Sequence, residues 1–169
     1  MDKMQSIYIS KVVLNIGTGS DSNMHDNAVK ILQVITNAKP TDGISKKRNP
    51  AFKVSKGQKI GALVTLRGKK AIDLLPRLFD AVDNKIGRSS ISTNSVNFGI
   101  KEYIDISGIK YDPKIGMLGM NVNVAFSRPG MRAALRKRKR ARIPAKHSII
   151  SADEIKDYIK ENFKVEVVQ

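Results

Sequence analysis

The segment RPGMRAALRKRKRARIPAKH, residues 128–147, most strongly limits how this chain can fold. It holds nine lysines and arginines, one histidine and no acidic residue. Like charges follow one another from Arg136 to Arg140, so a helix over residues 131–140 would fray in free solution. Unpaired charges of this kind do not enter a hydrophobic core. The core must come from the rest of the 169 residues, enough for one domain and hardly for two.

Four roles fit such a segment: a nucleic-acid tail, a targeting signal, a membrane-binding patch, or a merely solvated helix face. The chain has a net charge of +16, and outside the segment 22 basic residues still face 15 acidic ones. A nuclear targeting signal seldom explains charge spread over a whole chain, and membrane binding needs an apolar helix face beside the cations. The distribution therefore favours nucleic acid, with binding that weakens steeply as salt rises.

Several kinds of site find no support in the sequence. The chain has no cysteine, which excludes disulfides and thiolate zinc sites, and its two histidines are far apart. We expect His25 at the surface near a helix start. No catalytic triad or paired-carboxylate motif stands out, so we predict a non-enzymatic protein without metal or cofactor. No secretory segment and no apolar run near 18 residues is present, which indicates an intracellular protein that does not span a membrane.

Apolar residues alternate, as in half-buried strands, over residues 6–17, 60–68, 95–106 and 120–127, and a short strand is expected at 164–168. Helical spacing predicts helices over residues 24–38, 69–82 and 150–163. Residues 39–59 carry seven lysines and arginines without any period, so we expect an extended basic loop or a loose hairpin. Residues 83–95 are expected to form a loop.

The apolar stripes of these helices predict which residues are buried. They are Met24, Ala28, Ile31, Leu32 and Ile35 in the first helix, and Ile72, Leu75, Phe79 and Val82 in the second. Pro76 should kink or divide the second helix, because it lacks a backbone donor. The third has the best start signal, a capping box of Ser151 and Glu154 with a hydrophobic staple of Ile150 and Ile155.

This order of elements predicts a single two-layer α+β domain over residues 1–169, a mostly antiparallel sheet with helices on one face. The other face would carry Lys11, Asn15, Thr65 and Arg67. It is either a solvated surface or a platform for RNA. Likewise, the cations near the tip of the 39–59 loop either stay solvated or clamp phosphates.

Two rival functions stand beside RNA binding. A nucleotide-using or RNA-modifying enzyme would need the turn NIGTG, with Gly17 and Gly19, as a cofactor site. The third glycine of the dinucleotide fingerprint is replaced by Ser22, so a tight turn that needs positive φ explains these glycines as well. A free-standing DNA-binding protein would need a helix-turn-helix signal or a dimer seam, and neither is evident.

Five blocks in order resemble a known family over nearly the whole chain: VVLNIGTG, VITNAKP, AFKVSKGQKIGALVTLRG, NFGIKEYIDI and YDPKIGMLGMNV. This is the universal ribosomal protein family of the large subunit that binds 5S ribosomal RNA in the central protuberance. The ending RPG…RIPAKHSIISADE and the short start resemble its archaeal and eukaryotic branch.

The resemblance implies a structural protein of the cytoplasmic ribosome. It would act as a monomer that helps attach 5S RNA to large-subunit ribosomal RNA beside other 5S-binding proteins. Family contacts with 5S RNA fall on Asn15 and Thr65, and Asn37 is the candidate for a third, because TNAKP stands where the family has TGQKP. With the neighbouring cations, the expected 5S-binding residues are Lys11, Asn15, Asn37, Thr65 and Arg67.

The resemblance also assigns partners to both basic segments. Residues 44–57 would contact transfer RNA in the peptidyl site through Lys46, Lys47, Arg48, Asn49, Phe52, Lys53 and Lys56. The run 128–147 is expected to dock on ribosomal RNA, ordering as it docks, through Arg128, Arg132, Arg136, Lys137, Arg138, Lys139, Arg140, Arg142 and Lys146. An intersubunit bridge to a small-subunit head protein is implied as well, with residues 83–95 and 105–117 as candidate loops.

Overall fold

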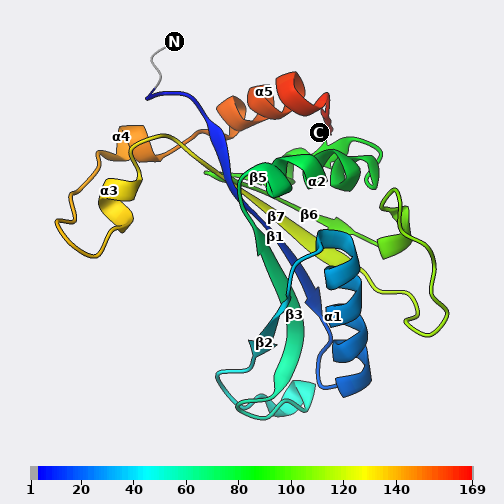
Figure 1. Cartoon of the computed structure of the whole chain (residues 1–169). Helices are drawn as coiled ribbons and strands as arrows, with labels where there is room; N and C mark the ends of the chain where they lie inside the picture. The colour runs from blue at the N-terminus through cyan, green and yellow to red at the C-terminus, as the bar shows by residue number, and fades with distance from the viewer. Residues whose placement is uncertain (1–3, 169) are drawn as a thin grey trace.

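The structure, a computed structural model, describes residues 4–168 and is drawn in Figure 1. Its strands are β1 (Tyr8–Gly17), β2 (Thr41–Ile44), β3 (Lys59–Leu66), β4 (Lys85–Gly87), β5 (Ile91–Ser92), β6 (Ser95–Ile100), β7 (Met120–Ser127) and β8 (Glu166–Val168). Its α-helices are α1 (Ser22–Thr36), α2 (Lys69–Asp80), α3 (Arg132–Leu135), α4 (Ala145–Ser148) and α5 (Ala152–Phe163). Three short 3-10 helices are η1 (Pro50–Phe52), η2 (Arg88–Ser90) and η3 (Tyr103–Asp105).

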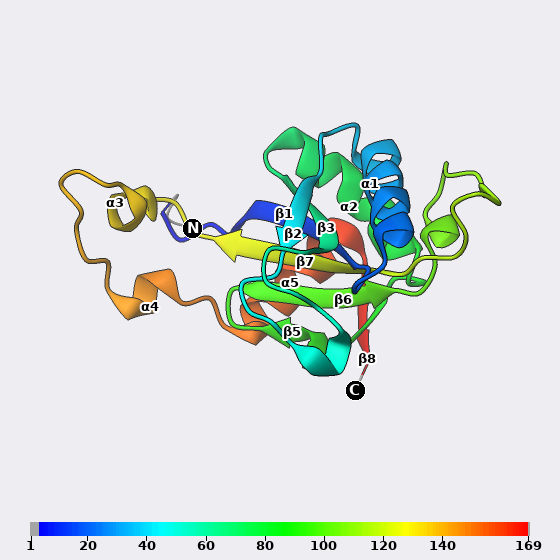
Figure 2. The ribbon, with the colours of Figure 1, turned by 90° about the horizontal axis from the view of Figure 1, so that it is seen from below.

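Six strands form one sheet in the order β2-β3-β1-β7-β6-β5, and every neighbouring pair is antiparallel. Helices α1, α2 and α5 cover one face of this sheet, whereas α3 and α4 lie on an excursion away from it (Figures 1 and 2). Outside the sheet, β4 and β8 pair in parallel. The predicted α+β class and the mostly antiparallel sheet are confirmed.

Strand β1 lies inside the sheet and supplies the centre of the core. Val12, Leu14 and Ile16 are fully buried, as their alternation predicts. The register shifts between Ile9 and Lys11, and this bulge places Ile9 on the core side as well. The side chains between these positions consequently point to the face without helices, where RNA was expected to bind.

Both predicted loops contain more structure than expected. Residues 39–59 form a hairpin, the second of the two alternatives, because β2 pairs with β3. The expectation of a loop over residues 83–95 is wrong, since β4, η2 and β5 occupy most of it. Strand β4 pairs with β8 near the other end of the chain, a partner that local periodicity cannot reveal.

Other segments are less regular than expected. The strand expected over residues 95–106 ends at Ile100, and η3 follows, with Tyr103 and Ile106 buried. Only Arg132–Leu135 of the charged run becomes helical in its first half. In these two segments, turns rather than longer regular elements bury the apolar side chains and relieve the repulsion between like charges.

Helix α2 runs through Pro76 without a break, so of the two expected alternatives, a kink or a division into two helices, the division is wrong. Pro76 lies on the exposed side, where water can satisfy the carbonyl that lost its partner. The predicted stripe is also rotated. Ile72 is 49% exposed, whereas Ala71, Leu74 and Leu78 are buried with Leu75 and Phe79.

In α1 the expected stripe is confirmed at Ala28, Ile31, Leu32 and Ile35, but Met24 is exposed. The prediction of a surface position for His25 is wrong, because only 3% of this residue is exposed. Its Nε2 lies 3.3 Å from Asp42 Oδ1 of β2, and its Nδ1 lies 3.6 Å from Asp26 Oδ1. The buried ring thus lies near two carboxylates between helix and sheet, although its Nε2 makes no hydrogen bond that meets the usual geometry.

Candidate nucleic-acid interface

The face of the sheet opposite the helices, called here the open face, brings together polar side chains from four strands. Asn15 of β1 is in register with Leu63 of β3 and Asn121 of β7. Val13, one step along, is in register with Thr65 and Asn123. Asn15 and Thr65, predicted from separate blocks of sequence, therefore lie on adjacent strands of one exposed surface.

Cations flank this open face, and no carboxylate belongs to it within the described strands. Lys11 extends from β1 in register with Ala125, and the exposed Arg67 directly follows the end of β3. Both continue the outward alternation that includes Asn15 and Thr65. Neutral hydrogen-bonding groups at the centre with positive charge at the rim suit a polyanion whose bases face the protein.

Asn37 lies apart from this face. It is the C-cap of α1 in the left-handed conformation, with φ of 48°, and its backbone N–H donates to the carbonyl of Gln33. The helix belongs to the layer on the opposite side of the sheet, so Asn37 lies outside the open face that carries Asn15 and Thr65. Asparagine suits this position because it tolerates positive φ, a structural reason for its presence.

The basic hairpin, residues 44–58, is a closed unit with its cations outside. Ser45 and Asn49 make backbone hydrogen bonds across to Gln58 and Val54, and the side chain of Val54 is buried. The Asn49 side chain accepts a hydrogen bond from the backbone N–H of Ala51, so it caps η1. The remaining predicted contact residues are all exposed: Lys46, Lys47, Arg48, Phe52, Lys53 and Lys56.

An ion pair fixes the base of this hairpin to the sheet. Lys59 Nζ lies 2.8 Å from Asp42 Oδ2. The hydrogen bond from Lys59 lowers the pKa of the Asp42 carboxyl below its usual value, and the same bond raises the pKa of Lys59. With His25 beside Asp42, helix α1, β2 and β3 meet at one point, which orients the hairpin relative to the open face.

The basic segment, residues 128–147, is an excursion beyond the edge of the main body (Figures 1 and 2). Arg136 Nε donates to the carbonyl of Lys139 and Arg140 Nε to that of Ala134, so the chain folds back on itself. Most of the predicted contact residues are exposed, namely Arg132, Arg136, Lys137, Arg138, Lys139, Arg140, Arg142 and Lys146. The cations are thus presented together, without carboxylates between them.

Arg128 differs from the other cations of the segment. Its side chain is 13% exposed, and it pairs with the Glu154 carboxylate in the first turn of α5. Its guanidinium also donates to the carbonyl of Lys146, so it ties together both ends of the excursion. Glu154 therefore does not complete the predicted capping box, although Ser151 accepts from its backbone N–H as expected. The staple residues Ile150 and Ile155 are both fully buried.

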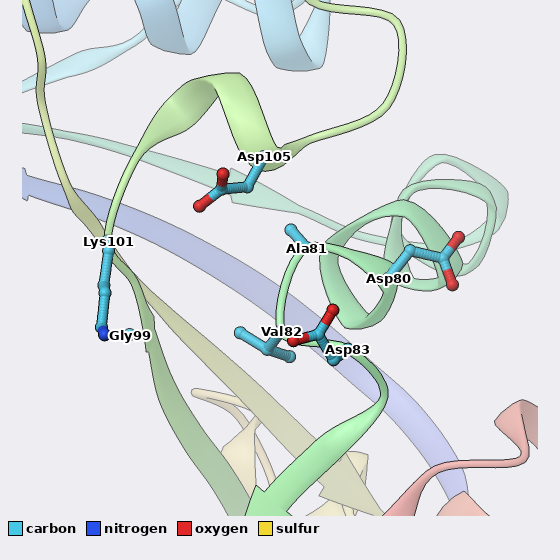
Figure 3. Close-up of a pocket in the computed structure, with 7 residues that line it drawn as sticks. All are labelled: Asp80, Ala81, Val82, Asp83, Gly99, Lys101 and Asp105. Carbon is cyan, nitrogen blue, oxygen red and sulfur yellow. The ribbon is translucent and has the colours of Figure 1, made fainter.

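An acidic pocket of about 480 Å³ limits the surface that RNA could cover (Figure 3). It lies between the end of α2, the end of β6 and the last residue of η3, and it is lined by Asp80, Ala81, Val82, Asp83, Gly99, Lys101 and Asp105. Three carboxylates against one ammonium repel phosphate. Positive charge is therefore concentrated on particular surfaces and absent from others, even on a chain of this net charge.

Three residues of the open face escaped prediction as site residues: Asn97, Asn121 and Asn123. In sequence each simply alternates with buried residues, such as Val96 and Val122. The signal that joins them to Asn15 is the order β1-β7-β6, which brings distant segments together. The only clue to this cluster in the sequence was the number of asparagines at outward-facing positions of the predicted strands.

The proposed cofactor turn does not suit a phosphate. Gly19 adopts φ of 63°, as a tight turn requires. Helix α1 is already capped by Asp21, whose Oδ1 accepts from the backbone N–H groups of Asn23 (2.9 Å) and Met24 (3.4 Å). A carboxylate thus occupies the place where a dinucleotide phosphate would bind. Residues 4–168 contain no cluster of three potential metal ligands and no helix long and apolar enough to cross a membrane.

Comparison with known proteins gives one consistent result. A model of ribosomal protein L5 matches residues 2–54, and a model of the C-terminus of the same ribosomal family matches residues 59–156. A large ribosomal subunit protein uL5 from Sulfurisphaera tokodaii is 41% identical over 170 residues, spanning 100% of this chain and 96% of the relative. Proteins of the same name from Cenarchaeum symbiosum (42% over 166 residues) and Methanosphaera stadtmanae (38% over 168) match 98% and 99% of both chains.

These matches cover nearly every residue, extend through both basic segments, and come from archaea, as the resemblance of the ending predicted. All three relatives are named as ribosomal proteins, in agreement with the expectation of a non-enzymatic chain. The chain belongs to the ribosomal protein L5 family.

Proposed function

We propose that this chain, a structural protein of the large ribosomal subunit, acts as one domain that binds 5S ribosomal RNA and attaches it to large-subunit RNA. The open face would hold 5S RNA through Asn15 and Thr65, and the basic segment would dock on the larger RNA. The observation that carries this assignment is the open face itself, with neutral hydrogen-bonding groups inside, cations at the rim and no carboxylate within the described strands.

Replacing Asn15 and Thr65 together by alanine tests 5S binding. Both side chains are exposed, so folding should be retained and thermal unfolding should be unchanged. Two lost hydrogen bonds to RNA should weaken binding about 10- to 100-fold in a filter assay. Asn162→Ala, on the exposed side of α5, is the matched control and should bind normally. Equal affinity of the double variant and wild type would remove 5S RNA from the open face.

The basic hairpin is the proposed contact with transfer RNA in the peptidyl site. Its backbone is closed by its own hydrogen bonds, and its cations together with Phe52, which is 72% exposed, point into solvent. Cations that are free of intramolecular ion pairs can neutralise phosphates without losing folded-state contacts. The exposed aromatic ring can stack on a base.

Charge reversal at the hairpin tip should separate its role from assembly. With Lys46, Lys47 and Arg48 all changed to glutamate, the protein should still enter the large subunit, since none of the three is buried. Peptidyl-site transfer RNA should bind about 10-fold more weakly or worse, because attraction to phosphate becomes repulsion. Reversal of Lys156 and Lys160 on α5 serves as the control. Failure of the hairpin variant to enter subunits would assign the hairpin to ribosomal RNA instead.

The third proposed contact is the bridge to a small-subunit head protein. The two candidate segments, residues 83–95 and 105–117, start at opposite sides of the acidic pocket, at Asp83 and Asp105 (Figure 3). Only the start of the first segment shares this end of the molecule with residues 105–117, because its last residues reach the far end of β6, where Asn94 hydrogen-bonds with Phe126 and Ile150. A negative pocket favours a basic protein segment over RNA there.

A further inference from the structure

Four asparagines on the open face form one contiguous cluster, called here the asparagine platform: Asn15, Asn97, Asn121 and Asn123. Asn15 is directly opposite Asn121 between β1 and β7, and Asn123 is directly opposite Asn97 between β7 and β6. The two pairs are neighbours on this face, because Asn121 and Asn123 are two residues apart along β7. The three strands run side by side in both views (Figures 1 and 2). Side chains opposite one another on one face are about 5 Å apart at Cβ, so the four amides are neighbours.

The platform is hollowed rather than flat. All four asparagines line one shallow depression together with Ser90, Phe98 and Gly99. Gly99 is in register with Asn121, and a Cβ on it would lie 3.6 Å from Asn121 Oδ1. Glycine therefore leaves the floor of the depression open beside the amide groups.

The amides of the platform are free to bind a ligand. Each carboxamide offers two N–H donors and one carbonyl acceptor. Among residues 4–168, the Asn97 side chain makes a 3.5 Å hydrogen bond to Ser95 Oγ, whereas those of Asn15, Asn121 and Asn123 bond to no protein group. All four are exposed, so their donors and acceptors face solvent in the free protein.

We propose that the asparagine platform binds the base edges of unpaired RNA nucleotides, while rim cations such as Lys11 and Arg67 hold the flanking phosphates. The inference rests on the proposed binding of ribosomal RNA at the open face, and it extends that site from β1 and β3 across β7 and β6. Carboxamides match the donor and acceptor pattern of base edges. In an A-form duplex the major-groove edges lie in a deep, narrow groove and the Watson–Crick edges are paired, so the edges of unpaired nucleotides fit the platform better.

The charge pattern supports bases rather than phosphates at the centre. No cation lies among the four asparagines, and no aromatic side chain is exposed there to stack on a base. Recognition would therefore depend on directional hydrogen bonds. Their loss should weaken binding equally at all salt concentrations, because no counterion release is involved.

The first test uses the triple variant Asn97→Ala, Asn121→Ala and Asn123→Ala, which leaves Asn15 and Thr65 in place. Affinity for 5S RNA should fall about 10- to 100-fold, with an unchanged slope of log affinity against log salt. Gly99→Val, which fills the depression but removes no polar group, should weaken binding as well. Asn162→Ala is the control, and thermal unfolding checks that every variant is folded.

Dimethyl sulfate probing of the bound RNA identifies what the platform contacts. Unpaired adenine and cytosine edges should be protected by the wild type and exposed again with the triple variant. If the triple variant protects the same base edges as the wild type, while 2′-deoxy substitution of the RNA weakens binding, the platform contacts the duplex backbone, and the proposal is overturned. If the wild type and the triple variant bind 5S RNA equally well, the proposal for the asparagine platform is wrong, while the proposed function still stands. Should the wild type not bind at all, the proposed function fails first.

Discussion

Replacing Arg136, Lys137, Arg138, Lys139 and Arg140 together by glutamine should weaken binding to large-subunit ribosomal RNA about 100- to 1000-fold near 0.1 M salt. Each phosphate neutralised releases counterions and contributes about 0.7 to 0.9 to the slope of log affinity against log salt. If three to five of these cations contact phosphate, the slope should fall by about two to four. Filter binding over a salt series measures both quantities.

The matched control removes the same charge elsewhere, by glutamine at five lysines exposed on or near the helical layer: Lys30, Lys69, Lys114, Lys156 and Lys160. At 0.1 M salt the Debye length is about 10 Å, so distant charges act weakly. The variant of the basic segment loses only two internal side-chain hydrogen bonds, those of Arg136 and Arg140, and should stay folded. Equal loss of affinity in both variants would mean that total charge, not a docking segment, governs binding.

The interior strands were predictable because their alternation is set by burial on one face. Val12, Leu14 and Ile16 in β1, and Val122 and Val124 in β7, have to point into the core wherever their partners lie. The same alternation placed Asn15 and Thr65 outward. The face of the sheet to which a side chain points can therefore be predicted from the local sequence.

The local sequence does not tell which strands lie side by side in the sheet. Nothing in the sequence around Asn97 says that β6 lies beside β7, or that β7 lies beside β1. The asparagine platform could therefore not be recognised before the strand order was known. His25 escaped for the same reason, since its carboxylate partner Asp42 belongs to β2, on a segment that was expected to be a basic loop or a loose hairpin.

Helix α2 shows a finer limit of helical periodicity. Its apolar residues support two overlapping stripes, one through Ile72, Leu75 and Phe79 and the other through Leu74, Leu75, Leu78 and Phe79. The sheet and α5 select the second stripe and leave Ile72 exposed, while Phe79 belongs to both. Spacing alone cannot decide between them, because either would give an amphipathic helix.

Phe79→Ala should therefore destabilise the fold by about 3 to 5 kcal/mol, whereas Ile72→Ala should stay within about 0.5 kcal/mol of wild type. Phe79 is 1% exposed. Its ring lies 5.4 Å from that of Phe98 in β6 and 5.3 Å from that of Phe163 in α5. Truncation would open a cavity where three elements meet. Urea unfolding followed by circular dichroism measures the difference, and similar losses in both variants would contradict the observed stripe.

The same variant distinguishes the two faces of the sheet. Phe79 packs on the helical side, and although its neighbour Phe98 also lines the depression, the four amides of the asparagine platform lie on the other face, so the cavity removes none of the proposed hydrogen bonds to RNA. A loss of about 3 to 5 kcal/mol is a large part of the roughly 5 to 15 kcal/mol that stabilises a typical domain. Less of the protein should be folded, but the folded fraction should bind 5S RNA with wild-type affinity and salt dependence. Weaker binding by the folded fraction would instead mean that the helical layer shapes the RNA-binding surface.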